Sequence, residues 1–157
     1  MIVRRFEEKD AKEVSALIIR TLRTTNIKDY SKAYIEKGVR ILNAKNIIEK
    51  ACTRHFYVAC IDEKIIGCGS IGYDEIKEES CFYTIFVLPE YQGRGVGKKI
   101  VKTLEKDEYA IRSKKIIVPS SITAKSFYIK MGYNDRLNNI ANDDGLFILE
   151  KIVNWKR

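Results

Sequence analysis

Three glycines within five residues, Gly93, Gly95 and Gly97, stand between an apolar run and a helical pattern. The run at residues 81–88 is almost entirely apolar, which is typical of a strand in the middle of a sheet. From residue 95 to about residue 112, apolar side chains recur at the spacing of one helix face. Glycine turns tightly and lets a ligand approach the backbone closely. The sequence therefore predicts a buried strand, a close turn, and a helix whose start is open to a ligand.

The chemistry of this turn favours a phosphorylated ligand. The free N–H groups and the dipole of a helix start attract phosphate, and Arg94, Lys98 and Lys99 add positive charge at the same place. The pattern is G-x-G-x-G, which is neither the G-x-G-x-x-G of a dinucleotide site nor a Walker loop with G-K-[ST]. Tight packing alone can also require a glycine-rich turn, so the spacing by itself leaves both interpretations open.

The rest of the chain alternates between strand-like and helical patterns. Strands are expected at residues 2–6, 56–61, 65–73, 81–88, 115–118 and 146–153. Helices are expected after a cap at Asp10, at residues 31–42, about 47–52, 95 to about 112, and 122–131. The turn at residues 62–64 predicts an antiparallel hairpin, whereas the strand–helix–strand unit from residue 81 to residue 118 predicts a parallel pair. The expected fold class is α/β, with a mixed sheet and helices on its faces.

Size and composition fit one globular domain over residues 1–157, with 45% hydrophobic and 32% charged residues. No run reaches the ~18 apolar residues of a membrane span, and the N-terminus lacks the pattern of a secretory signal. The four cysteines form no CxxC pair, so a zinc site is not expected. Reduced, mostly buried thiols and a cytoplasmic location are the expectation.

The glycine turn resembles the Q/R-x-x-G-x-G/A motif of the GNAT superfamily of N-acetyltransferases through QGRGVG at residues 92–97, and VLPEY at 87–91 is similar to that family's lead-in. The order of elements resembles the family over the whole chain. The resemblance implies an acyl-CoA N-acyltransferase fold, with a mixed, mostly antiparallel sheet flanked by helices. It also implies acetyl-coenzyme A as cosubstrate and no metal. The positions that it places along the pantetheine arm are Phe86, Val87 and Leu88, and those that it places at the pyrophosphate are Gln92, Gly93, Arg94, Gly95, Val96, Gly97 and Lys98.

A second segment, AKSFYIKMGY at residues 124–133, resembles the family's A-x-x-x-Y-x-x-x-G-F/Y motif. The tyrosine of that motif typically lies near the thioester sulfur, and the resemblance assigns this place to Tyr128. A hydroxyl that donates a proton stabilises a departing thiolate. The structural alternative for Tyr128 is an ordinary core aromatic.

The sequence departs from the family pattern at two positions. Many members have asparagine three residues before the alanine of the second motif, where this chain has Ser121, which can also hydrogen-bond a cofactor. Some branches use a glutamate as general base at the position of Cys81. Glu79 lies two residues earlier and on the same strand face, which makes it the candidate base. Glu78 and Glu90 are further candidates, and ordered water with backbone carbonyls is the alternative to all three.

Three functions follow from these observations. The first is acetyl transfer from acetyl-coenzyme A to a primary amine by direct attack. The second is a coenzyme A-binding domain without turnover, which the missing strand carboxylate keeps open. The third is nucleic-acid binding, motivated by the net charge of +8, but the basic residues are scattered and no known binding motif is present.

The resemblance implies a small-molecule or peptide amine as the acceptor, in a pocket built largely from the helices between Asp10 and Cys52 and the nearby strands. No nucleic-acid or membrane partner is expected, and a homodimer is a candidate state because dimers are common on the resembling fold. The acidic group Asp74, Glu75, Glu78 and Glu79 could attract a cationic amine, and surface solvation explains it equally well. Trp155, in the charged tail, is a candidate for packing or for an interface.

Overall fold

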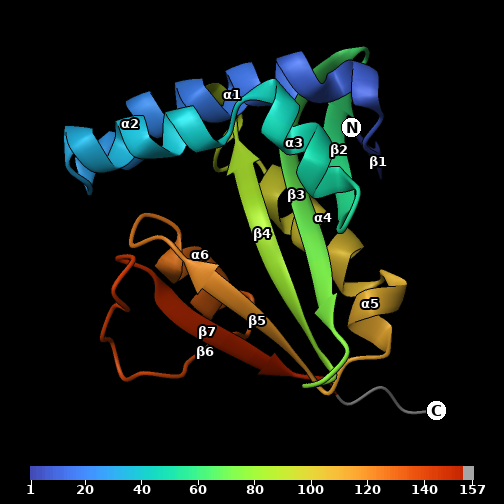
Figure 1. Cartoon of the computed structure of the whole chain (residues 1–157), viewed down its shortest axis with the longest axis vertical. Coiled ribbons are helices and arrows are strands. Elements are labelled where there is room, and N and C mark those ends of the chain that lie inside the picture. Colours follow the sequence, from blue (N-terminus) through green and yellow to red (C-terminus); the bar gives the residue numbers. More distant parts are fainter. Residues whose placement is uncertain (154–157) are drawn as a thin grey trace.

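The computed structural model describes residues 1–153, so Trp155 lies outside the described residues. Figure 1 shows a long sheet with helices packed on it. The strands are β1 (Ile2–Arg5), β2 (His55–Ile61), β3 (Lys64–Asp74), β4 (Glu79–Val87), β5 (Lys115–Ser120), β6 (Asn134–Asp135) and β7 (Phe147–Ile152). The α-helices are α1 (Ala11–Thr24), α2 (Lys32–Ile41), α3 (Ala44–Ala51), α4 (Val96–Glu105), α5 (Glu108–Ile111) and α6 (Lys125–Lys130). Short 3₁₀ turns are η1 (Glu8–Asp10), η2 (Asn26–Lys28) and η3 (Pro89–Tyr91).

The sheet has seven strands in the order β1-β2-β3-β4-β5-β7-β6. Every neighbouring pair is antiparallel except β4 and β5, which are parallel. This pair is joined over three positions, Glu79 with Lys115, Ser80 with Ile116, and Cys81 with Ile117. Beyond them the two strands diverge, so the sheet opens like a V (Figure 1). The expected mixed, mostly antiparallel sheet flanked by helices is confirmed.

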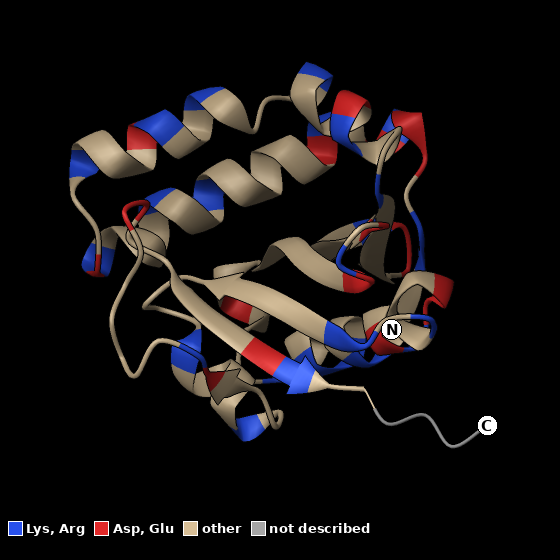
Figure 2. Ribbon diagram, turned by 60° about the horizontal axis from the view of Figure 1, so that its bottom comes forward, with Lys and Arg blue, Asp and Glu red and all other residues tan. Residues whose placement is uncertain are grey.

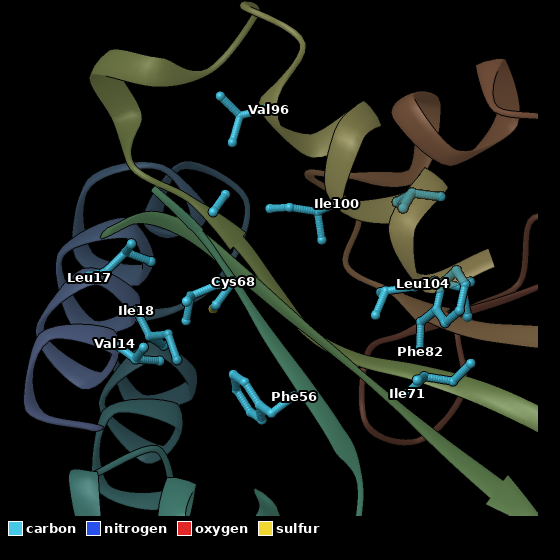
Figure 3. Packing of buried hydrophobic residues seen from close by; sticks show 14 of the residues in the cluster. Val14, Leu17, Ile18, Phe56, Cys68, Ile71, Phe82, Val96, Ile100 and Leu104 are labelled. Atoms are coloured by element: carbon cyan, nitrogen blue, oxygen red, sulfur yellow. The ribbon is translucent and has the colours of Figure 1, made fainter. Parts of the chain in front are cut away.

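Helices cover both faces of the larger, N-terminal part of the sheet. Val14, Leu17 and Ile18 of α1 pack on one face of β3, and Ile100 and Leu104 of α4 pack on the other (Figure 3). Periodic apolar residues on α1 and α4 are buried, which is why these segments form helices in this context. The two layers fix the end of β4 and the start of α4 against a rigid core.

The expected long helix over residues 95 to 112 is wrong, because it breaks into α4 and α5. Asp107 lies at the break and accepts a hydrogen bond from the Tyr109 N–H at 2.9 Å, so it caps a new helix start. The same carboxylate also accepts a bond from the Tyr57 hydroxyl at 2.6 Å and lies 2.9 Å from Nδ1 of His55. These long-range partners, on β2, stabilise a local break that the apolar spacing conceals.

Other boundaries shift by a few residues. The last helix begins at Lys125 rather than Ile122, and β4 begins at Glu79 rather than Cys81. The two-residue strand β6, paired with β7, carries no sequence signal long enough to predict it. Within residues 1–153, no helix is both long and apolar enough to cross a bilayer.

Candidate active site

The opening between β4 and β5 contains a cavity of about 1080 Å³. Its walls come from the C-terminal half of β4, the glycine turn before α4, the segment after β5, helices α1 and α2, and the loop between β6 and β7. Figure 1 shows that this loop and the segment after β5 both lie on the side of the opening that faces α2. The cavity therefore has two ends. One lies at the glycine turn predicted to bind phosphate, and the other is lined by residues of α1 and α2.

A bulge in β4 shapes the cavity wall. The register between β3 and β4 shifts between Cys68 and Ser70, and Thr84 has a φ of 54°. Positive φ is strongly unfavourable for a β-branched residue, so the surrounding structure holds this conformation in place. The Ser70 hydroxyl donates to the Tyr83 carbonyl at 3.0 Å, and the Cys68 thiol donates to the Thr84 carbonyl at 3.3 Å. Both contacts fix the bulge where β4 begins to line the cavity.

The glycine turn leaves the start of α4 open. Gly93 and Gly95 have φ values of 73° and 84°, and Gly95 is the N-cap residue of α4. No side chain caps this helix start, and a Cβ atom at either glycine would meet nothing within 4 Å. The Gln92 side chain donates to the Val87 carbonyl at 3.0 Å and ties the turn to the end of β4. The exposed amides at this helix start are suited to bind an anion.

Most of the residues predicted at coenzyme A line the cavity. These are Phe86, Val87, Gln92, Gly93, Gly95, Gly97, Lys98 and Ser121. Leu88 and Val96 do not, because their side chains are buried in the core. Arg94 also lies outside the lining, with its guanidinium 5.5 Å from the centre of the Tyr91 ring. The structure thus places the end of β4, the glycine turn and Ser121 around one cavity, whereas Leu88 and Val96 point into the core.

Tyr128 lies in the core beside the cavity rather than in its lining. Its side chain is 4% exposed and packs edge-on against Phe127 and Tyr133 at centroid distances of 5.1 and 6.0 Å. Phe127, the preceding residue, does line the cavity. Burial raises the pKa of Tyr128 well above its ordinary value, so its hydroxyl stays protonated at any physiological pH.

The predicted bases lie away from the cavity and are ion-paired. Glu79 begins β4 at the closed end of the opening and pairs with Lys115 at 3.3 Å. Glu78 pairs with Lys114, and Glu90 pairs with Arg20 at 2.7 Å. None of the three lines the cavity.

The other end of the cavity is lined by Tyr30, Tyr34 and Lys37, before and on α2, and by Asp143 and Asp144, in the loop between β6 and β7. The first three fall within the region expected to build the acceptor pocket, although sequence reasoning singled out none of them, and it missed the two aspartates. The loop that holds the two aspartates carries only a turn signal in the sequence, which does not indicate a ligand site. The two aspartates have no ion pair within residues 1–153, unlike the acidic group between β3 and β4. In that group Glu75 pairs with Arg112, and the Asp74 carboxylate accepts from the backbone of its own turn.

No group of three or more histidine, cysteine or acidic side chains is arranged to hold a metal ion in the part of the chain that the structure describes. The expectation that the reaction needs no metal stays a prediction.

Comparisons with known proteins agree with this geometry. Residues 52–135 match the family described as "Acetyltransferase (GNAT) domain". An uncharacterized N-acetyltransferase of Escherichia coli K12 is 29% identical over 131 residues, which cover 83% of this chain and 79% of that protein. An uncharacterized N-acetyltransferase of Methanocaldococcus jannaschii is 34% identical over 111 residues, covering 64% of this chain and 69% of that protein.

The fold also matches solved structures. The PaiA N-acetyltransferase from Thermoplasma acidophilum, solved in complex with coenzyme A, superposes with a TM-score of 0.84 at 19% identity, over 97% of this chain and 98% of that one. At this identity the likeness shows the fold, and the family match and the two sequence relatives show the lineage. The resemblance seen in the two sequence motifs is confirmed, and the chain belongs to the GNAT superfamily of N-acetyltransferases.

Proposed function

We propose that this protein transfers the acetyl group of acetyl-coenzyme A to a primary amine of a small-molecule or peptide acceptor, by direct attack. The observation that carries the proposal is the single cavity that joins the open start of α4 to the opening between β4 and β5. A phosphorylated cosubstrate fits the uncapped helix start at one end. The relative from Thermoplasma acidophilum is described as a complex with coenzyme A, and we extend that ligand to this chain.

The residues around the cavity suit each step of this reaction. The pyrophosphate binds the amides of the turn at Gly93 and Gly95, and the thioester lies along β4 beside its bulge. Backbone N–H groups of β4 polarise the thioester carbonyl, as in an oxyanion hole. The neutral amine nitrogen attacks that carbonyl, the carbon–sulfur bond breaks, and Tyr128 gives its proton to the departing thiolate. The nitrogen gives up one proton to water as the amide forms, and a proton from water restores the Tyr128 hydroxyl.

The acceptor amine enters from the end walled by α2 and the loop between β6 and β7. Asp143 and Asp144, whose carboxylates form no ion pair within residues 1–153, line this end together with one ammonium-bearing residue, Lys37. Carboxylates attract an ammonium-bearing molecule, so this end suits a cationic amine better than an anionic one. The attacking amine must first lose a proton, and water held by backbone carbonyls is the proposed route, because Glu79 is engaged with Lys115.

Calorimetry with acetyl-coenzyme A tests the binding half of the proposal. Gly95→Ala and Gly95→Glu form a matched pair, because both place a side chain at a φ of 84° and neither side chain meets protein atoms at its Cβ. Only the glutamate adds a negative charge at the anion site. We expect binding by the wild type, weaker binding by Gly95→Ala, and none by Gly95→Glu. Equal binding by all three folded proteins would place the cosubstrate elsewhere.

An amine panel with acetyl-coenzyme A then tests turnover. A non-catalytic coenzyme A-binding domain is the second candidate, and the lack of a cavity-lining carboxylate on β4 is the observation that favours it. Binding without acetyl transfer to polyamines, amino acids, aminoglycosides or peptide amines would select that candidate.

Nucleic-acid binding has less support than either. Figure 2 shows Lys and Arg interspersed with Asp and Glu over several elements rather than gathered on one of them. The cytoplasm remains the proposed location, because all four cysteines are free thiols, as a reducing compartment would keep them.

A further inference from the structure

The Tyr30 hydroxyl lies where three segments meet. It donates a hydrogen bond to the Gly145 carbonyl at 2.9 Å and accepts one from the Ile122 N–H at 2.8 Å. Gly145 belongs to the loop between β6 and β7, and Ile122 belongs to the segment after β5. Tyr30 itself precedes Ser31, the N-cap of α2. One hydroxyl thus joins the segment before α2 to the segment after β5 and to the loop between β6 and β7.

The segment that Tyr30 holds is the part of the cavity wall next to the predicted coenzyme A site. Ser121, Thr123 and Ala124 line the cavity, and the Ser121 hydroxyl accepts from the Ala124 N–H at 3.1 Å. Thr123 donates to the Asp29 carboxylate at 2.8 Å, next to Tyr30 in the sequence. Residues 29 and 30 therefore fix this segment at two points.

Tyr34 is a natural comparison, because its ring stacks on that of Tyr30 with centroids 4.4 Å apart and planes 13° apart. Its hydroxyl donates to the Asp144 carbonyl at 3.0 Å. It makes no hydrogen bond with residues 121–124 in the part of the chain that the structure describes. Tyr34 thus holds only the loop between β6 and β7, which we call the acceptor loop. Tyr30 holds this loop and also the cavity wall at residues 121–124, next to the predicted coenzyme A site.

We propose that Tyr30 is a positioning residue that couples the two ends of the cavity, through its hydrogen bonds to Gly145 and Ile122. The inference rests on the proposed acetyl transfer and adds a link between its two binding sites. β4 and β5 are joined over three positions only, so their diverging ends need contacts of this kind to keep a fixed spacing on the side of α2. With the link in place, the acceptor loop and the segment at Ser121 hold one arrangement, and acetyl-coenzyme A meets a preformed wall.

The test compares Tyr30→Phe with Tyr34→Phe, which each remove one hydroxyl oxygen and keep the stacked ring. Amide hydrogen exchange without ligand reads the link directly. Loss of one hydrogen bond corresponds to exchange about three- to tenfold faster. Tyr30→Phe should speed exchange at Ile122 and in the loop at residues 142–146, whereas Tyr34→Phe should speed it in the loop only.

Calorimetry and steady-state kinetics then measure how the loss of this link changes ligand binding. We expect Tyr30→Phe to weaken acetyl-coenzyme A about three- to tenfold by calorimetry and to raise the acceptor KM as well. Tyr34→Phe should raise the acceptor KM and leave acetyl-coenzyme A binding within about twofold of the wild type. Equal effects of the two variants on acetyl-coenzyme A, or unchanged exchange at Ile122 in Tyr30→Phe, would overturn the coupling.

The two proposals fail in distinguishable ways. If the wild type binds no acetyl-coenzyme A, the proposed function fails. The exchange pattern still decides the link between the two walls in that case, because it needs no ligand. If the wild type transfers acetyl groups and both variants match its kinetics, the function stands and the positioning role of Tyr30 is refuted.

Discussion

The surroundings of Tyr128 keep its hydroxyl protonated, as the proposed role of proton donor requires. Burial raises its pKa, and no hydrogen bond to another group within residues 1–153 competes for its proton. The rings of Phe127 and Tyr133 fix its orientation. A single oxygen can therefore be removed there at little structural cost, which makes its role testable.

Tyr128→Phe should lower kcat for acetyl transfer about 100-fold with little change in the KM for acetyl-coenzyme A, because a general acid acts on the transition state. Steady-state kinetics with a responsive amine checks this, and thermal unfolding serves as the folding control. A variant with unchanged kcat would return Tyr128 to the role of a core aromatic.

Glu79→Gln tests the carboxylate that the sequence predicts as base. Lys115 keeps its second partner, Glu150, at 3.3 Å in this variant, so the free energy of unfolding should fall by no more than about 1 kcal/mol. Because Glu79 is ion-paired outside the cavity, we expect kcat to stay within about twofold of the wild type. A fall of about 100-fold at neutral or higher pH, shrinking at low pH where the wild-type carboxylate is itself protonated, would instead establish Glu79 as the base.

At the scale of single elements, Asp10 joins β1 to α1. Its carboxylate accepts two hydrogen bonds from Arg4, at 2.8 and 3.0 Å, and a third from the Glu7 N–H at 2.8 Å. Asp10 is 5% exposed, and the hydrogen bonds from Arg4 lower its pKa below the ordinary 3.8. A lowered pKa means that this carboxylate stabilises the fold fully above pH 3.8 and loses its contribution as the pH falls through the folded-state value.

Asp10→Asn should lower the free energy of unfolding by about 1–3 kcal/mol at pH 7, as measured by urea unfolding. The gap from the wild type should narrow as the pH falls below 3.8 toward the lowered folded-state pKa, because Asp10 of the unfolded chain takes up its proton first. Glu36→Gln is the matched control, since Arg23 also holds Glu36 through two hydrogen bonds, at 3.0 and 2.9 Å, but at an exposed site. Its loss should be smaller, and a pH-independent gap for Asp10→Asn would contradict the assignment.

Packing of α4 on β3 depends on Gly69. A Cβ atom there would lie 2.7 Å from Cγ2 of Ile100 and 3.2 Å from Cγ1 of Ile85, so α4 can approach the sheet only because the side chain is absent. Gly69→Ala should destabilise the protein by about 1–3 kcal/mol. Combining it with Ile100→Ala should cost less than the sum of the two single changes, because the second change removes the clash. Additive losses in urea unfolding would show that the two residues do not meet.

At the scale of the whole molecule, ligand binding is coupled to stability, because the cavity between the diverging strands β4 and β5 forms only in the folded protein. A ligand that binds only the folded state stabilises it by mass action, by about 2.7 kcal/mol at 100 times its Kd. Acetyl-coenzyme A at that concentration should therefore raise the Tm by about 5–10 °C for a domain of this size. Thermal scans should show this shift in the wild type and none in Gly95→Glu. An equal shift in both proteins would mean that the ligand binds away from the start of α4.

The sequence by itself determined most of the strands and helices, and the end of the cavity at the glycine turn. Apolar residues at helical or strand spacing predict which side chains are buried. The glycines at residues 93–97 predict a tight turn with a backbone conformation that other residues rarely adopt. Both signals are local, so the strand, turn and helix around Gly95 could be read directly. The strand–helix–strand unit also predicted the parallel pair, because the helix returns the chain to the edge of the sheet at which the first strand began.

The tertiary structure decided what the local patterns could not express. Asp107 breaks the helix after α4 because Tyr57 and His55, about 50 positions earlier, bind its carboxylate. The bulge at Thr84 depends on partners in β3, and the engagement of Glu79 depends on Lys115 across the parallel pair. The end of the cavity proposed for the acceptor is closed by hydrogen bonds from Tyr30 and Tyr34 to a loop more than 100 residues away in the sequence. Such contacts depend on strand register and on which distant segments pack together, and the spacing of residues within a single segment does not encode either.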